Sequence, residues 1–114
     1  MKTRISRRVV WALFGALLSV GSVSYADEDV NMALAKAKQC LACHQVDARR
    51  VGPSFRLIAE RYGIADGAVE YLSQSIRNGG KGRWGALTMP RQPQVSEEEA
   101  VQLAQWILKQ APAK

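Results

Sequence analysis

The residues of this 114-residue chain that could do chemistry are concentrated in one stretch, Cys40-Leu41-Ala42-Cys43-His44. It contains both cysteines and the only histidine. If the stretch is helical, Cys40, Cys43 and His44 leave from one face, because residues three and four positions apart are neighbours on a helix. Two thiols followed by an imidazole are the attachment signature of c-type haem. We therefore predict one haem c, bound through two thioethers at Cys40 and Cys43, with His44 as an iron ligand.

Three other kinds of site contain a Cys-x-x-Cys pair. A dithiol redox site normally opens a helix beside a βαβ unit, and the sequence shows no such pattern. A zinc site needs four ligands, and the chain has no second cluster of Cys or His. A disulfide between Cys40 and Cys43 would close a very short loop and would constrain the unfolded chain little. We favour haem because only haem explains the histidine after the second cysteine.

Met89 is the expected second iron ligand. Met1 belongs to a predicted leader, and Met32 lies in the helix that leads into the cysteines, so Met32 would have to reach round the porphyrin edge. Met89 lies in a glycine-rich loop 45 positions after His44 and can cover the opposite face. A thioether sulfur favours ferrous iron and raises the reduction potential, which suits an electron carrier. The alternative is that Met89 fills a gap in the core.

The first 26 residues have the pattern of a secretory signal peptide. A basic segment is followed by an apolar run at 9–23 and by small residues ending at Ala26. The run is shorter than the roughly 20 residues of a membrane-spanning helix, although an uncleaved anchor remains the alternative. Ser6-Arg7-Arg8 resembles a twin-arginine signal, but haem of this kind is attached after export, so we expect the chain to cross unfolded. We predict cleavage after Ala26, a periplasmic location and no stable membrane insertion afterwards.

Removal of the leader changes the charge of the chain. The full chain has a net charge of +6, but four of its 16 basic residues and none of its 10 acidic residues lie in the leader. Residues 27–114 therefore have a net charge of +2, which removes the main support for nucleic-acid binding. These 88 residues form one small domain with a marginal core. A large apolar cofactor would supply part of what that core lacks.

We expect an all-α fold, because apolar residues recur at helical spacing and no run alternates as in a strand. The first helix should lead directly into the cysteines, with an apolar stripe of Val30, Ala33, Leu34, Ala37 and Leu41. The second should begin after Val51-Gly52-Pro53 and end at Gly63. Its apolar residues are Phe55, Ile58, Ala59 and Tyr62.

The third and fourth helices have recognisable ends. We expect Asp66 to cap the third helix, Asn78-Gly79-Gly80 to end it, and its inward face to consist of Val69, Leu72 and Ile76. Ser96 and Glu99 make a capping box at the start of the fourth, and Lys109 lies in its last turn. The apolar stripe of the fourth helix is Ala100, Leu103, Ala104, Ile107 and Leu108.

Short segments along the whole mature chain resemble the short bacterial class I cytochromes c of the cytochrome c-551 type. They are Cys40-Leu-Ala-Cys-His44, Val51-Gly-Pro-Ser54, Ile58-Ala-Glu-Arg-Tyr62, Ile76-Arg-Asn-Gly79, Gly82-Arg-Trp-Gly85, Met89-Pro90 and Val95-Ser96. The resemblance implies the class I cytochrome c fold, with about four helices wrapped around one covalently attached haem. It also implies His/Met ligation of the iron and an electron-shuttle role in the periplasm.

The resemblance implies roles for individual residues. His44 is the proximal ligand and Met89 the distal ligand, and the Pro53 carbonyl accepts the other N–H of the proximal imidazole. Arg77 and Trp84 resemble residues that hydrogen-bond the inner haem propionate. A solvated arginine at a helix end and a core tryptophan are the respective alternatives.

The chain departs from the family pattern around the distal ligand. Ala86 and Thr88 stand where family members often have prolines, so the loop is expected to be looser. The segment Arg91-Gln92-Pro93-Gln94 is one residue longer than usual before the last helix. Gln92 is the candidate for a hydrogen bond to the Met89 sulfur.

We expect a monomeric electron carrier, not an enzyme, that shuttles single electrons between respiratory donors and terminal reductases or oxidases. One alternative is a haem-bearing subunit of a larger reductase complex. Another is a ligand-binding or peroxidase-like protein with an open iron position, which would call for a distal His or Arg; the chain has no second His.

The redox partners are expected to present acidic docking surfaces. From Arg49 to Arg91 the chain has eight basic and three acidic residues, a local net charge of +5, while the flanking segments sum to −3. A basic ring around the exposed haem edge would raise the rate of encounter with acidic partners. The alternative is an ordinary solvated surface.

Overall fold

A computed structural model describes residues 25–112, and in this part of the chain the fold is helical. It contains α1 (Tyr25–Ala37), a short 3₁₀ helix η1 (Cys40–Ala42), α2 (Phe55–Tyr62), α3 (Ala68–Asn78) and α4 (Glu97–Leu108). The only strand-like pairing in this part is a single bridge between Gly80 and Met89. The predicted all-α fold of about four helices is confirmed. The predicted leader lies outside the described residues except for Tyr25 and Ala26, which begin α1.

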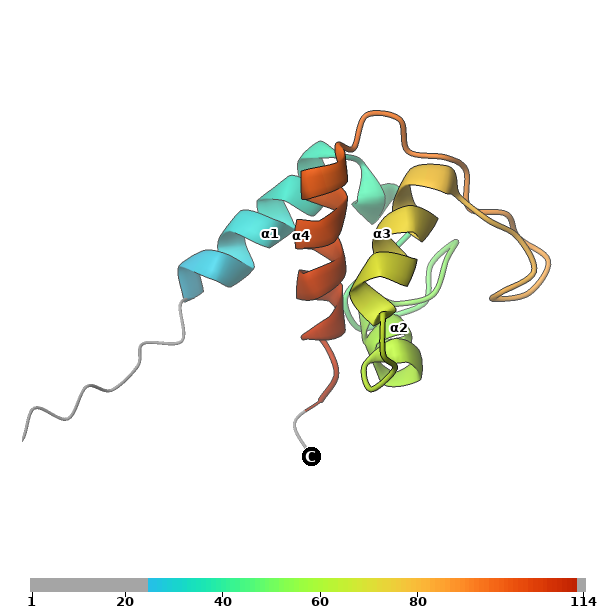
Figure 1. Ribbon diagram of the computed structural model, residues 1–114, viewed down its shortest axis with the longest axis horizontal. Coiled ribbons are helices and arrows are strands. Elements are labelled where there is room, and N and C mark those ends of the chain that lie inside the picture. Colours follow the sequence, from blue (N-terminus) through green and yellow to red (C-terminus); the bar gives the residue numbers. More distant parts are fainter. Residues whose placement is uncertain (1–24, 113–114) are drawn as a thin grey trace, which may run out of the picture.

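Helix α4 lies at the centre of the fold and contacts each of the other three α-helices (Figure 1). Its buried residues reach neighbours on both sides: Phe55 of α2, Leu72 and Ile76 of α3, and Ala35 of α1 belong to one hydrophobic core with them. The largest of these α4 residues is Trp106, which is 1% exposed. No helix in the described range is long and apolar enough to cross a membrane.

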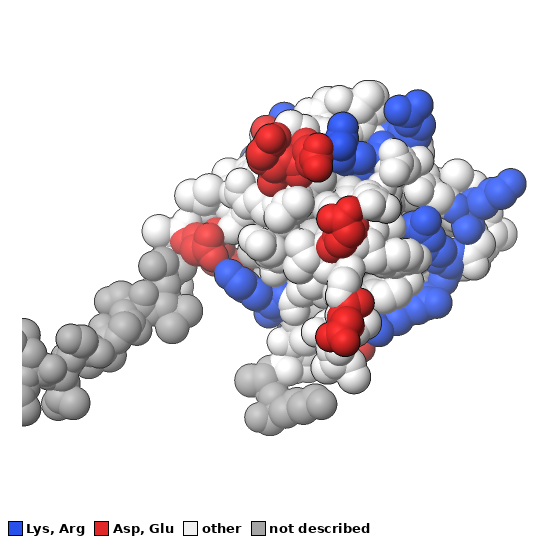
Figure 2. All heavy atoms as spheres, viewed as in Figure 1, with Lys and Arg blue, Asp and Glu red and all other residues white. Residues whose placement is uncertain are grey.

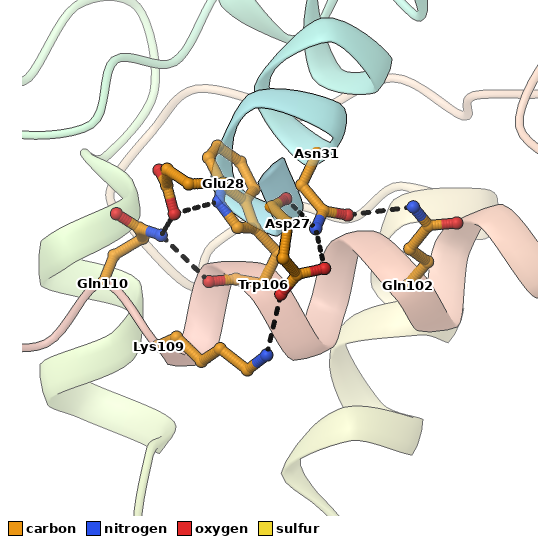
Figure 3. Close-up of polar contacts among 7 residues, drawn as sticks. All are labelled: Asp27, Glu28, Asn31, Gln102, Trp106, Lys109 and Gln110. Atoms are coloured by element: carbon orange, nitrogen blue, oxygen red, sulfur yellow. Dashed lines mark hydrogen bonds and ion pairs between the residues drawn. The ribbon is translucent and has the colours of Figure 1, made fainter. Parts of the chain in front are cut away.

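The predicted apolar stripe of α1 is only partly confirmed. Leu34 and Leu41 pack against the hydrophobic core, whereas Val30 is 57% exposed and the buried residues of this helix are Asn31 and Ala35. The difference arises because α1 also packs on α4 through polar contacts, which a search for apolar periodicity does not detect. Gln102 of α4 donates a hydrogen bond of 3.0 Å to the side-chain oxygen of Asn31, so this buried amide is paired (Figure 3).

Further polar contacts continue this α1–α4 interface toward the end of α4 (Figure 3). The indole N–H of Trp106 donates to Glu28 at 2.9 Å, which satisfies the polar atom of a buried tryptophan. Lys109 donates to Asp27 at 3.2 Å. The interface therefore binds the first turn of α1 to the last turns of α4.

Helix α1 ends earlier than the sequence predicts and does not run into the cysteines. Gln39 adopts a left-handed conformation with φ of 65° and breaks the helix after Ala37. The chain then forms the 3₁₀ turn, in which Cys43 and His44 both donate backbone hydrogen bonds to the Cys40 carbonyl, at 3.1 and 2.9 Å. The three motif side chains are thus close together, although on a tight turn and not on the end of α1.

The boundaries of α2 agree with the prediction, whereas the start of α3 does not. Ser54 caps α2 by accepting a hydrogen bond from the backbone N–H of Leu57 at 3.1 Å. The expected cap of α3 by Asp66 is wrong: Gly67, at φ of 74°, precedes the helix, and no side chain caps it. A left-handed residue at this position redirects the chain without a polar cap.

The start of α4 agrees with the prediction in detail. The N–H of Glu99 donates to the Ser96 hydroxyl at 3.1 Å, and the Ser96 N–H donates to the Glu99 carboxylate at 2.9 Å, which is a complete capping box. Glu99 also forms a salt bridge of 2.8 Å with Lys38, the residue that follows α1. The hydrogen bond from Lys38 and then that from the Ser96 backbone hold the pKa of Glu99 below its ordinary value of 4.5.

We predict that Glu99→Gln makes the protein less stable at neutral pH, because it removes the salt bridge with Lys38. A carboxylate whose pKa is lower in the folded state contributes stability above its unfolded pKa, and loses it as the pH falls through the folded pKa. The difference from the wild type should therefore shrink below pH 4.5. Urea unfolding at a series of pH values measures this difference. Glu98→Gln is the matched control, because Glu98 makes no ion pair within residues 25–112.

Candidate haem site

A large apolar cavity lies between the Cys-x-x-Cys-His turn and the loop that follows α3. Its walls are mostly apolar and are contributed by α2, α3, α4 and the loops between them. Cys40, Cys43 and His44 line it, and so does Met89 from the loop that follows α3. The residues expected to hold a haem are therefore brought to one cavity by segments far apart in the sequence. Met32 packs against the hydrophobic core instead.

His44 is fixed in one orientation. Its Nδ1 lies 2.7 Å from the Pro53 carbonyl oxygen, which can only accept, so Nδ1 carries the proton and Nε2 has a free lone pair. The ring stacks on Phe55 with centroids 5.4 Å apart and planes inclined by 20°. On another side lies Gly52, where a Cβ would come within 2.7 Å of the imidazole. The His44–Pro53 contact that the resemblance implies is present, and it leaves Nε2 available to a metal.

The two cysteines do not have the properties of a redox dithiol. Neither is in a disulfide bond. Burial raises the pKa of the Cys40 thiol, whereas reactive Cys-x-x-Cys sites lower the pKa of their nucleophilic cysteine. Residues 25–112 also contain no group of three or more His, Cys, Asp or Glu side chains that could hold a metal ion such as zinc. Thioether attachment to a haem is the chemistry that this donor set fits.

Met89 is anchored through its backbone to the end of α3. Its N–H donates to the Gly80 carbonyl at 2.8 Å, and the Gly80 N–H donates to the Met89 carbonyl at 3.0 Å. Close approach of the two segments requires glycine at 79, because a Cβ there would overlap the Met89 carbonyl, and φ at this residue is 70°. This pairing places Met89 at the cavity on the wall contributed by the loop.

Trp84 lines the cavity within a cluster of aromatic and arginine side chains. It makes an edge contact with Tyr62 at 6.2 Å between centroids, and the Arg61 guanidinium lies over its ring at 4.5 Å. Burial, followed by the hydrogen bond with the neighbouring Tyr71, raises the pKa of Tyr62, so this phenol stays neutral at physiological pH. The cluster supports the loop on which Trp84 lies.

The structure does not bring Arg77 to the cavity. Ile76 lines the cavity, and the next residue of an α-helix points about 100° away from it. Arg77 accordingly faces the start of α4, where its Nη1 lies 3.8 Å from the carboxylate of Glu97. The role implied for Arg77 by the resemblance is not supported by this position.

Arg83 lines the cavity, although nothing in the sequence distinguishes it from the other basic residues of the loops. Its Nη1 donates to the Ser75 hydroxyl at 2.7 Å, and its guanidinium lies 5.1 Å from the centre of the Tyr71 ring. Its carbonyl accepts a hydrogen bond of 2.6 Å from Arg61. Gly80 is close enough that a Cβ would lie 2.9 Å from the guanidinium carbon. The contact depends on how the loop folds back on α3, which no local pattern reveals.

The cavity therefore fits a haem. Its lining includes two thiols, an imidazole with a free Nε2, a thioether and mostly apolar walls. Its lining also includes three cations, Arg49, Lys81 and Arg83, which suit the two carboxylates that a haem carries.

Comparison with known proteins identifies the family to which this chain belongs. The family model described as "Cytochrome C oxidase, cbb3-type, subunit III" matches residues 30–107. Cytochrome c-552 of Hydrogenobacter thermophilus is 43% identical over 96 residues, which cover 84% of this chain and 93% of that protein. Cytochrome c-551 of Pseudomonas denitrificans is 48% identical over 75 residues, or 66% of this chain and 90% of that protein. The crystal structure of Nitrosomonas europaea cytochrome c552 superposes with a TM-score of 0.67 at 44% identity, covering 68% of this chain and 96% of that one.

The helical fold around a cavity with a Cys-x-x-Cys-His turn defines a class I cytochrome c with one haem. The chain belongs to the cytochrome c family, within the group of cytochromes c-551 and c-552, and it carries electrons through covalently attached haem c.

Proposed function

We propose that the protein shuttles single electrons in the periplasm, with His44 and Met89 as the two axial ligands of the haem iron. The observation that carries this proposal is that His44 and Met89 line the same cavity, His44 with a free Nε2 and Met89 on the wall formed by the loop. When bound, the haem supplies the reversible one-electron redox chemistry.

The residues of the chain orient the haem and determine its potential. Cys40 and Cys43 would hold the ring in register with His44, while the Pro53 carbonyl raises the basicity of the imidazole. The thioether of Met89 would favour ferrous iron and raise the potential. If His44 and Met89 both held the iron, no position on it would be left for a substrate, which supports electron transfer without enzymatic activity.

The cation that would bind a haem carboxylate is Arg83, in place of Arg77. Arg83 lines the cavity and is oriented by Ser75 and Tyr71, whereas Arg77 pairs with Glu97 outside it. Trp84 lines the same part of the cavity, so its indole N–H is a second candidate donor.

Export by cleavage of the leader after Ala26 is the proposed route to the periplasm, because the leader pattern precedes a domain that needs haem attachment. The partners are proposed to be electron donors and acceptors with acidic docking surfaces. Lys and Arg side chains gather on the side of the molecule where the loop after α3 lies, and acidic ones lie mainly on the rest of this face (Figure 2). Arg49, Lys81 and Arg83 line the cavity mouth itself and form what we call the basic rim.

A haem-bearing subunit of a larger reductase complex is the second candidate function. The description of the matching family model, which names an oxidase subunit, favours it. Purification under mild conditions separates the two functions: an electron shuttle elutes as a monomer, and a subunit elutes with other chains.

We predict that Met89→Ala removes the sulfur-to-iron absorption band of the ferric protein, lowers the reduction potential and allows carbon monoxide to bind the ferrous protein. Absorption spectra and redox titration measure these changes. Met32→Ala is the matched control and should leave all three unchanged, because Met32 packs against the core. An unchanged band in the Met89 variant would show that another group ligates the iron.

We predict that Arg83→Met, but not Arg77→Met, shifts the pH dependence of the reduction potential. A nearby cation lowers the pKa of a carboxylate, so its loss should move the titration of the haem carboxylate to higher pH. Both variants lose one positive charge, so a general charge effect cancels in the comparison. The other groups around this position are Arg49, Lys81, Arg61, Tyr62 and Tyr71. Equal profiles for the two variants would refute the role of Arg83.

We predict that Lys81→Glu slows electron transfer to a negatively charged redox protein several-fold at low ionic strength, and much less at high ionic strength. Stopped-flow measurements at both salt concentrations test this. Lys36→Glu makes the same change of charge on the exposed end of α1 and is the control. If the two variants slow the reaction equally, the basic rim does not direct docking.

A further inference from the structure

The segment between Met89 and α4 is tied to the segment that precedes the haem-attachment turn. The Gln94 side-chain amide donates a hydrogen bond of 3.0 Å to the Lys38 carbonyl, and the Lys38 ammonium donates one of 3.0 Å to the Gln94 carbonyl. Lys38 and Gln94 are 56 positions apart, so these two reciprocal hydrogen bonds form a tertiary contact.

Lys38 is followed by a residue with an unfavourable backbone conformation. The next residue, Gln39, is the only non-glycine residue with positive φ in the described part of the chain, and it turns the backbone toward Cys40. A non-glycine residue in this conformation costs free energy and persists only where its surroundings hold it. Because α1 has just ended, the Lys38 carbonyl lacks a helical partner, and Gln94 supplies one.

Gln94 is also connected, through Gln92, to the residue that follows Met89. The same amide donates to the side-chain oxygen of Gln92 at 2.7 Å, and the Gln92 amide donates to the Pro90 carbonyl at 2.9 Å. Pro90 directly follows Met89, and Gln92 itself lines the cavity. Because the Gln92 oxygen is engaged by Gln94, its NH₂ group is turned toward the Met89 end of the segment.

We propose that Gln94 is a positioning residue for the distal ligand: its amide joins the Lys38 carbonyl, at the start of the haem-attachment turn, to the segment that follows Met89. On its N-terminal side Met89 is held by its backbone pairing with Gly80. The residues between Met89 and Gln94 are mostly exposed. After Met89 the segment is also held by a long backbone hydrogen bond of 3.4 Å from Gln92 to the Arg77 carbonyl, and Gln94 adds the side-chain anchor that joins it to the haem-attachment turn. This inference rests on the proposed function, in which Met89 ligates the iron.

The experiment compares Gln94→Met with Gln102→Met in the haem-loaded protein. Both replace an amide by an unbranched apolar side chain of similar length, and both remove a contact to the α1 region, because Gln102 donates to Asn31. Only Gln94 is connected to the Met89 segment. Imidazole is titrated into the ferric protein, and its binding is followed by loss of the sulfur-to-iron band. Unfolding in urea reports the stability of each variant.

We expect imidazole to bind Gln94→Met about fivefold more tightly than Gln102→Met, because loss of one net hydrogen bond shifts the open state of the loop by about that factor. Equal imidazole affinities at similar stability would overturn the proposal. If Gln94→Met retains too little haem, or if its new thioether takes the place of Met89, Gln94→Asn is compared with Gln102→Asn in the same way, since the shorter amide cannot reach both Lys38 and Gln92. The Met89→Ala spectrum decides separately whether Met89 is a ligand, so failure of one proposal is distinguishable from failure of the other.

Discussion

The orientation of the His44 imidazole depends on contacts that extend through the whole fold. The Pro53 carbonyl fixes one ring nitrogen at 2.7 Å, and Phe55 stacks on the ring. Phe55 in turn meets Trp106 at 5.2 Å in an edge arrangement, and the Trp106 indole donates to Glu28 of α1. A core substitution far from the cavity can therefore alter the orientation of the His44 ring, because these rings pack as one unit.

The two sides of the cavity are built differently. On one side His44 packs against Phe55 of α2, which contacts Trp106 of α4, and both belong to the hydrophobic core. On the Met89 side a mostly exposed loop is held at its ends, by the pairing with Gly80 and by the hydrogen bonds of Gln92 and Gln94. Such a loop has fewer buried contacts and opens at lower cost than the core. The position of Met89 therefore depends on a few polar contacts, whereas that of His44 depends on core packing.

The relatives are similar to this chain over most of their own length, and the solved structure of one cytochrome c552 has the same fold. Arg83, on the loop after α3, donates a hydrogen bond to Ser75 of α3. Gln94 donates a hydrogen bond to Lys38, which is 56 positions away in the sequence. Such contacts can change between relatives without altering the core, because they lie at the surface.

The sequence by itself determined the haem motif, the helical class, the capping box of α4 and the presence of Met89 in the loop, because each depends on local spacing or periodicity. Only the tertiary structure decided that Asn31 is buried while Val30 is exposed, and that Arg83 lies at the cavity while Arg77 does not. The physical reason is that the rotation of a helix about its axis is set by its partners. The polar pairs that select this rotation join residues far apart in the chain, such as Asn31 and Gln102.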